Sequence, residues 1–191
     1  AVSVIGVGSI TAAGIVAVLV AREFLAGPAD RGAFVQPLWT IFALTGLRVE
    51  AALRLDALSL VMTLVVTIVG ALIHLYSTGY MKDDPGYARF FACMNLFVAA
   101  MLTLVLADDM LFLFVGWEGV GVCSFLLIGF WYDDPANGKA AAKAFLVTRI
   151  GDVLLAIAMF LFVAEFGTLH MATLLERAPI AWGMGSGLAA L

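Results

Sequence analysis

Charged side chains are scarce in this chain. Only 13% of its 191 residues are Asp, Glu, Lys or Arg, whereas 64% are hydrophobic and the mean hydropathy is +1.09. Soluble domains are typically about 45 to 50% apolar and about 25% charged. This deficit of charge excludes an ordinary soluble domain and indicates a membrane protein.

Basic runs and paired cysteines are also missing. The chain has 10 basic against 14 acidic residues, with no cluster able to neutralise a row of phosphates, so nucleic acid is excluded as a partner. The two cysteines, Cys93 and Cys123, lie far apart in apolar stretches without a CxxC or Cys/His spacing, which argues against a disulfide framework or a zinc site. Of the two histidines, His170 falls in a polar connection, so a haem held by two histidines is disfavoured.

Five apolar runs approach or exceed the roughly 20 residues that a spanning helix needs. They cover about residues 2–21, 57–81, 90–107, 110–132 and 143–165, and another run starts at about residue 181. The first run lacks the basic segment of a secretory signal and is interpreted as a span. We therefore predict an all-α polytopic membrane protein, with about five complete transmembrane helices and the start of a sixth in one membrane domain over residues 1–191.

The connection between the first two spans has a different periodicity. Apolar and polar residues alternate from Leu47 to Asp56, which is the period of a β-strand. With Thr45-Gly46 as a turn and residues 34–44 as the partner strand, the pattern predicts a small extramembrane β-hairpin over about residues 34–55. The acidic pairs at residues 108–109 and 133–134 precede helices and are interpreted as helix starts.

Basic residues near the span ends indicate the orientation. Two short loops hold Lys82, Arg89 and Lys139, with Lys143 at a helix mouth, whereas the opposite side has basic residues spread over a longer stretch. Because cytoplasmic loops carry an excess of Lys and Arg, the loops of Lys82 and Lys139 are predicted to be cytoplasmic.

Three of the 24 charged residues fall well inside predicted spans: Glu118, Arg149 and Asp152. An ionised side chain at the centre of a bilayer costs about 2.5 to 3.5 kcal/mol even on lenient scales. Glu118 lies roughly 12 Å into its span, and no basic residue within four positions can pair with it. It is either a protonated acid that binds a neighbouring helix or a titratable site on a proton or cation path.

The other internal charges also have two interpretations. Arg149 and Asp152 stand three residues apart and so share a helix face, where they can neutralise each other without further function. Together with Lys143 they also mark successive depths of one span, as a proton relay requires. His74 is the only intramembrane imidazole and is either a proton shuttle or an interfacial anchor.

Four blocks of this sequence resemble one family of membrane proteins. They are Leu55–Leu60, Gly86–Phe91, Lys143–Asp152, and the run Gly116-Trp117-Glu118-Gly119-Val120-Gly121 continued through Cys123–Phe130. These blocks are similar to the antiporter-like subunits of respiratory complex I, NADH:quinone oxidoreductase, and within them to the subunit L, or chain 5, family. The resemblance implies an N-terminal fragment of a longer antiporter-like fold.

The resemblance implies a proton-translocating subunit that couples electron transfer from NADH to quinone, which occurs in other subunits, to proton pumping. Glu118 would be the central carboxylate, paired with a lysine that lies outside this chain. Asp152, Arg149, Lys143 and His74 would be the other translocation residues. Trp117, Gly119 and Gly121 would support Glu118.

The family also implies a setting. No cofactor, metal or redox chemistry is expected on this chain, because NAD, FMN, the iron–sulfur clusters and quinone belong to partner subunits. The expected partners are lipids and other membrane subunits of complex I, especially the antiporter-like subunit M, in the bacterial inner membrane. The alternative is a subunit of an Mrp-type cation/proton antiporter without redox partners.

Overall fold

The computed structural model describes residues 2–28, 32–44 and 46–181. The elements follow in the order α1 (Val2–Ala26), β1 (Phe34–Leu44), β2 (Leu47–Leu55), α2 (Ala57–Tyr80), α3 (Tyr87–Leu106), α4 (Met110–Ile128), α5 (Pro135–Phe166) and α6 (Met171–Ala181). Helices α1 to α5 are long and apolar enough to cross a membrane. The predicted all-α polytopic membrane protein with a small hairpin is confirmed.

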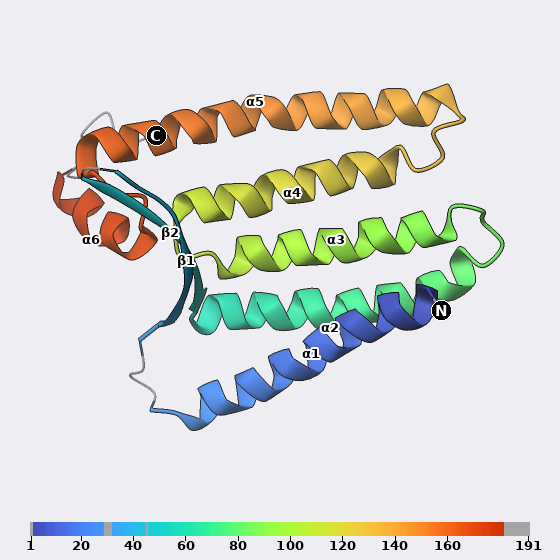
Figure 1. The fold of residues 1–191 in the computed structure, drawn as a ribbon, viewed down its shortest axis with the longest axis horizontal. Coiled ribbons are helices and arrows are strands. Elements are labelled where there is room, and N and C mark those ends of the chain that lie inside the picture. The colour runs from blue at the N-terminus through green and yellow to red at the C-terminus, as the bar shows by residue number, and fades with distance from the viewer. Residues whose placement is uncertain (1, 29–31, 45, 182–191) are drawn as a thin grey trace.

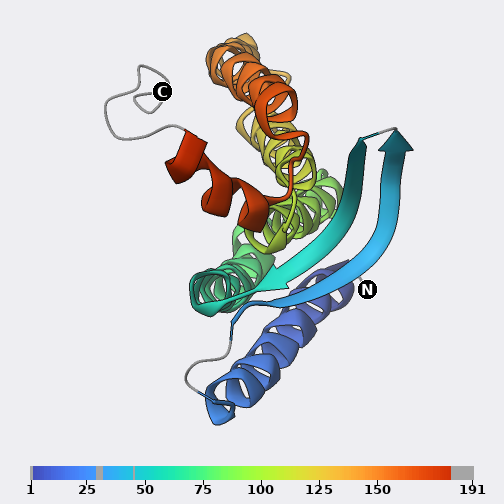
Figure 2. The same cartoon turned by 90° about the vertical axis from the view of Figure 1, so that its left-hand side faces the viewer.

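The five long helices form a row in chain order, from α1 at one edge to α5 at the other (Figure 1). The hairpin and α6 lie at the same end of this row, and Figure 2 shows the strands crossing that end beside α6. Large apolar side chains on the long helices stay exposed, such as Ile5, Leu72 and Phe160. An exposed apolar surface of this kind is suited to lipid or to other membrane helices.

Several helix boundaries differ from those expected. Helix α5 has 32 residues and begins at Pro135, not near residue 143, because Asp134 caps it and proline is favoured in the first turn. Helix α1 continues to Ala26, and α4 ends at Ile128 instead of residue 132. The polar stretch before residue 181 forms α6, which the sequence pattern did not predict. The expected span from about 181 continues into residues 182–191, which lie outside the described part, as does Thr45 of the expected turn.

Aspartates cap three of the long helices. The Asp56 carboxylate accepts a hydrogen bond from the Ser59 backbone N–H, while the Ser59 hydroxyl accepts one from the Asp56 N–H, which completes a capping box. Asp109 accepts from the Leu111 N–H at 2.8 Å and Asp134 from the Ala136 N–H at 2.8 Å. The second member of each acidic pair is therefore a helix cap, as interpreted from the sequence.

The hairpin is held to the helices by its second strand. The two strands pair antiparallel, with Phe34 opposite Leu55 and Leu44 opposite Leu47. Every residue of β1 is exposed, whereas Val49, Ala51 and Ala52 of β2 are buried. Val49 packs with residues of α5, and Ala51 packs with Ala107 and Phe112. Apolar burial therefore fixes β2 across the ends of α3, α4 and α5.

At the opposite end, Arg89 is stacked between two aromatic rings. Its guanidinium lies 4.5 Å from the ring centre of Phe130 and 4.7 Å from that of Tyr132. It also donates a hydrogen bond to the Phe130 carbonyl oxygen at 2.8 Å. This arginine, which contributes to the predicted orientation, thus also joins the start of α3 to the end of α4.

Helices α3 and α4 approach each other through glycines. A Cβ atom added at Gly116 would lie 2.5 Å from the backbone nitrogen of Leu104, and one at Gly119 would lie 2.9 Å from the Ala100 Cβ. No side-chain movement relieves the first contact, because backbone atoms make it. Gly116 therefore sets the α3–α4 distance, as small residues do where membrane helices cross closely.

We expect Gly116→Ala to lower the stability of the membrane-embedded full-length protein by about 1 to 3 kcal/mol, the usual cost of overpacking. Thermal unfolding of the purified protein measures the effect. Gly79→Ala is the matched control, since nothing lies within 4 Å of a Cβ atom at that position. Equal unfolding temperatures for the two variants would show that α3 and α4 do not depend on this close contact.

Candidate functional site

Three of the residues predicted as sites form one charged network between α4 and α5. The Arg149 guanidinium pairs with the Glu118 carboxylate on the neighbouring helix. Its Nε also lies 3.3 Å from Oδ2 of Asp152, one turn along α5. The sequence predicted the second contact from the three-residue spacing. The partner of Glu118 lies on another helix, so local spacing did not reveal it.

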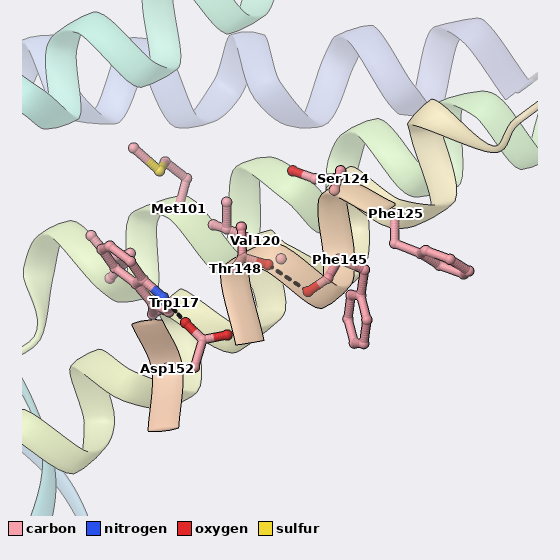
Figure 3. A pocket seen from close by; sticks show the side chains of 11 residues that line it. Met101, Trp117, Val120, Ser124, Phe125, Phe145, Thr148 and Asp152 are labelled. Carbon is pink, nitrogen blue, oxygen red and sulfur yellow. Dashed lines mark hydrogen bonds between the residues drawn. The ribbon is translucent and has the colours of Figure 1, made fainter. Parts of the chain in front are cut away.

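Trp117 joins the network through Asp152, and Figure 3 shows this contact. Its indole Nε1 donates a hydrogen bond of 2.6 Å to Oδ1 of Asp152. The Asp152 side chain is only 5% exposed, so it depends on this donor and on Arg149. Trp117 was expected only to support Glu118, and its contact is with the other carboxylate. The sequence did contain a signal for such a contact, since an indole N–H inside a membrane helix needs a hydrogen-bond acceptor.

The guanidinium is held on two further sides. Its carbon lies 4.3 Å from the ring centre of Phe145, one turn before it on α5. On the α4 side it lies over Gly121, where a Cβ atom would come within 3.0 Å of Nη2. Gly121 therefore makes room for Arg149, whereas Gly119 contacts α3 instead. The two glycines expected to support Glu118 thus act on different neighbours.

The network borders a pocket between α3, α4 and α5. The pocket has a volume of about 310 Å³ and is mostly apolar. Trp117, Ser124, Thr148 and Asp152 are its polar lining residues (Figure 3). Polar groups on one wall of an apolar cavity can orient a few water molecules. Water in this pocket would lie beside the Asp152 carboxylate.

Burial separates the two carboxylates. About 26% of the Glu118 side chain is exposed, against 5% for Asp152. Glu118 has only Arg149 as a partner in the described part of the chain, whereas Asp152 has both Arg149 and Trp117. With all three groups ionised, two negative charges face one positive charge. The network then carries one uncompensated negative charge, to which a proton or another cation can bind.

Lys143 and His74 lie apart from this network. Lys143 is exposed on α5, six residues before Arg149 and so about 9 Å along the helix axis. His74 is on α2, from which α3 separates the charged pair (Figure 1). Its imidazole is fully buried, its Nδ1 donates to the Gly70 carbonyl oxygen at 2.8 Å, and its ring meets Phe91 edge-on. The neighbouring Tyr76 and Tyr80, not His74, have the exposure of interfacial anchors.

A second charged cluster at the hairpin end escaped the sequence interpretation. Asp108 was interpreted as part of a helix start, but its side chain is 1% exposed and contacts Arg54 and His170. Arg54 lies on β2, Asp108 in the α3–α4 turn and His170 in the α5–α6 turn. Only the long-range fold brings them together. Within residues 2–28, 32–44 and 46–181, no group of three or more His, Cys, Asp or Glu is placed to hold a metal ion.

Comparison with known sequences matches most of the chain to one superfamily. Residues 39–91 match the family described as NADH-Ubiquinone oxidoreductase (complex I), chain 5 N-terminus. Residues 107–189 match the family described as NADH:quinone oxidoreductase/Mrp antiporter, TM. The second match contains Glu118, Arg149 and Asp152.

Curated relatives and a solved structure agree with these matches. NADH-quinone oxidoreductase subunit L of Escherichia coli K12 is 48% identical over 97% of this chain, and that of Pseudomonas aeruginosa is 48% identical over 93%. The chain spans 30% and 29% of the length of these relatives. A chain of the Mrp complex from Dietzia sp. DQ12-45-1b has a similar fold, with a TM-score of 0.71 and 34% identity over 87% of this chain and 17% of that one. The chain therefore belongs to the antiporter-like subunit family of NADH:quinone oxidoreductase, with subunit L as its matching branch.

Proposed function

We propose that this chain is part of a proton-translocating subunit of NADH:quinone oxidoreductase, in which Glu118 takes up and releases the proton. The observation that carries the proposal is the network of two carboxylates around one guanidinium inside membrane-spanning helices. Its excess negative charge is costly in a medium of low dielectric constant. Uptake of one proton removes that charge.

The two carboxylates have different roles in this proposal. Asp152 is buried and fixed by Trp117 and Arg149, so it anchors the guanidinium. Glu118 is more exposed and pairs only with Arg149 among the described residues, so its charge is sensitive to any movement of Arg149 or to the approach of a second cation. A lysine from the rest of the full-length protein is the expected second cation. Its movement toward Glu118 would favour release of the proton, and its withdrawal would favour uptake.

Lys143 and His74 extend the path in this proposal. Lys143 lies on the same helix as Arg149, toward the loops of Lys82 and Lys139, and would conduct protons between that surface and the network. His74 is buried on α2, with its Nε2 lacking a hydrogen-bond partner among the described residues. It would exchange protons with the network only through groups on α3 or through water.

The proposal includes the surroundings of the chain. Electron transfer would take place in partner subunits that hold NAD, FMN, iron–sulfur clusters and quinone, and the chain itself would perform no redox chemistry. Subunit M would be its neighbour in the bacterial inner membrane, with lipids around the apolar helices. The loops of Lys82 and Lys139 would face the cytoplasm.

A subunit of an Mrp-type cation/proton antiporter is the second candidate, favoured by the similar fold of the Mrp complex chain. The two candidates differ in their energy source. Sodium-dependent proton exchange without NADH would favour the antiporter. Co-purification with flavin and iron–sulfur subunits would favour the redox-driven pump.

We expect Glu118→Gln in the full-length protein to reduce NADH-driven proton pumping in membrane vesicles by about ten-fold or more, because an amide cannot carry the proton. Glu118→Asp should reduce it less, since it keeps the carboxylate. Pumping is measured with a pH-sensitive dye per NADH oxidised and per assembled complex. Glu165→Gln, an exposed carboxylate near the end of α5, is the matched control and should pump normally. Full pumping by Glu118→Gln would overturn the proposal.

The excess negative charge of the network also predicts how substitutions of Arg149 and Glu118 change the stability of the protein. Arg149→Gln should destabilise the protein by about 1 to 3 kcal/mol, less than the 3 to 5 kcal/mol of a fully buried pair, because about a quarter of the Arg149 and Glu118 side chains is exposed. Adding Glu118→Gln should restore part of the loss, since it removes an unpaired negative charge. Adding Glu165→Gln should restore none. Thermal unfolding of the wild type, Arg149→Gln and the two double variants measures this. If Glu118→Gln restored no stability to Arg149→Gln, a guanidinium shared by the two carboxylates would be contradicted.

A further inference from the structure

The hairpin end of the protein contains an ion cluster centred on Asp108. The Asp108 carboxylate lies 3.4 Å from Nη1 of Arg54 on β2 and 2.8 Å from Nε2 of His170 in the α5–α6 turn. Its side chain is 1% exposed, so it is cut off from water. A buried carboxylate is costly without its charged partners, so a change of charge at Arg54 or His170 weakens the contact between the segments that carry these residues.

Backbone hydrogen bonds place the same three segments in contact. The Asp108 N–H donates to the Ala52 carbonyl oxygen of β2 at 3.1 Å. The Met171 N–H donates to the Asp108 carbonyl oxygen at 3.1 Å, and the Met110 N–H donates to that of Leu169 at 2.9 Å. The α3–α4 turn is therefore held between β2 on one side and the α5–α6 turn on the other.

The cluster extends to the start of α2. Nε of Arg54 lies 3.3 Å from Oδ2 of Asp56, the residue that caps α2. Asp56, Arg54, Asp108 and His170 thus link the hairpin-side ends of α2 to α5. Helix α4 carries Glu118 about 15 Å from Asp108 along its axis, and α5 carries Arg149 and Asp152.

His170 is the member of the cluster that meets water. Its side chain is 44% exposed, and Nδ1 lies 3.2 Å from the Thr173 hydroxyl. With Asp108, it lines a cavity of about 250 Å³ between the hairpin and the α5–α6 turn. Imidazole is the side chain that commonly changes its charge between about pH 5 and 8. A proton can therefore reach His170, the partner of the buried Asp108 carboxylate, directly from solution.

The charge balance of the cluster depends on His170. Arg54 is balanced by Asp56 and Asp108 with one negative charge in excess, and a protonated His170 removes that excess. The other charged groups facing the cavity are Arg48 and Glu50, which pair with each other, and Asp109. Burial raises the pKa of Asp109, while its hydrogen bonds from α4 backbone N–H groups and the charge of His170 oppose that rise.

We propose that Asp108 is a positioning residue whose salt bridge to protonated His170 clamps the α5–α6 turn to the α3–α4 turn. The clamp fixes the relative position of α4 and α5, and hence of Glu118 and Arg149. Loss of the His170 proton leaves a weaker neutral contact and loosens the two turns. The clamp itself is independent of the proposed function, whereas its effect on pumping rests on that function.

Hydrogen exchange of the intact full-length protein in its complex tests the clamp. Peptides covering residues 167–176 are compared at about pH 6 and about pH 8, after correction for the intrinsic pH dependence of exchange. In the wild type, protection of the Met171 amide, which bonds to the Asp108 carbonyl oxygen, should fall by about ten-fold at the higher pH. The reason is that the charged hydrogen bond between His170 and the Asp108 carboxylate is lost there. In His170→Lys, whose side chain stays charged, the Met171 amide should remain protected at both pH values. In His170→Gln, whose side chain stays neutral, the Met171 amide should be weakly protected at both pH values.

Asp109→Asn is the matched control, because asparagine also caps helices and the salt bridge to His170 is made by Asp108. It should keep the wild-type pH dependence, whereas Asp108→Asn should lose it. A wild type without this pH dependence, or a His170→Gln variant that retains it, would overturn the clamp.

Pumping measurements test the positioning role separately. His170→Lys should flatten the dependence of NADH-driven pumping on pH over the range in which the wild-type clamp loosens. An unchanged pH profile beside altered exchange would overturn the positioning role of Asp108. Full pumping by Glu118→Gln would instead overturn the proposed function and leave the exchange result intact, so the two failures are distinguishable.

Discussion

The pairing of Arg149 with two carboxylates is the interaction on which the charged interior depends. Inside helices that are long and apolar enough to cross a membrane, each of these charges alone would be costly. The guanidinium lies between Glu118 on α4 and Asp152 on its own helix, and Trp117 adds a donor to Asp152. Because one cation serves two anions, the network is held together and still has an excess negative charge, which the proposed uptake of a proton by Glu118 would remove.

The packing around the network serves this arrangement. Gly116 and Gly119 bring α3 against one side of α4, while Gly121 leaves space for the guanidinium on the side of α5. At the hairpin end, buried residues of β2 and the Asp108 cluster hold the turns that precede α4 and follow α5. The two helices that share the charges are thus fixed at one end by both apolar burial and ion pairing.

Much of the fold could be predicted because its signals are local. Apolar runs marked the five long helices, strict alternation marked β2, and aspartates marked the starts of α4 and α5. The start of α5 was predicted too late in the chain, since Asp134 and Pro135 allow this helix to begin among polar residues. Helix α6 was missed because its charged residues and Pro179 are typical of a connection. Among the site residues, spacing alone predicted the contact of Arg149 with Asp152.

The sequence by itself determined that the chain is a membrane protein, that its described part contains five long apolar helices, and that Glu118, Arg149 and Asp152 lie far from the ends of two of them. Those conclusions follow from hydropathy and from spacing along one helix. The tertiary structure alone decided that Arg149 neutralises Glu118, that Trp117 binds Asp152, and that Asp108 meets Arg54 and His170. These contacts join residues 31 to 62 positions apart, and no local pattern reports the distance between separate helices. The charge balance of the site is therefore a property of helix packing.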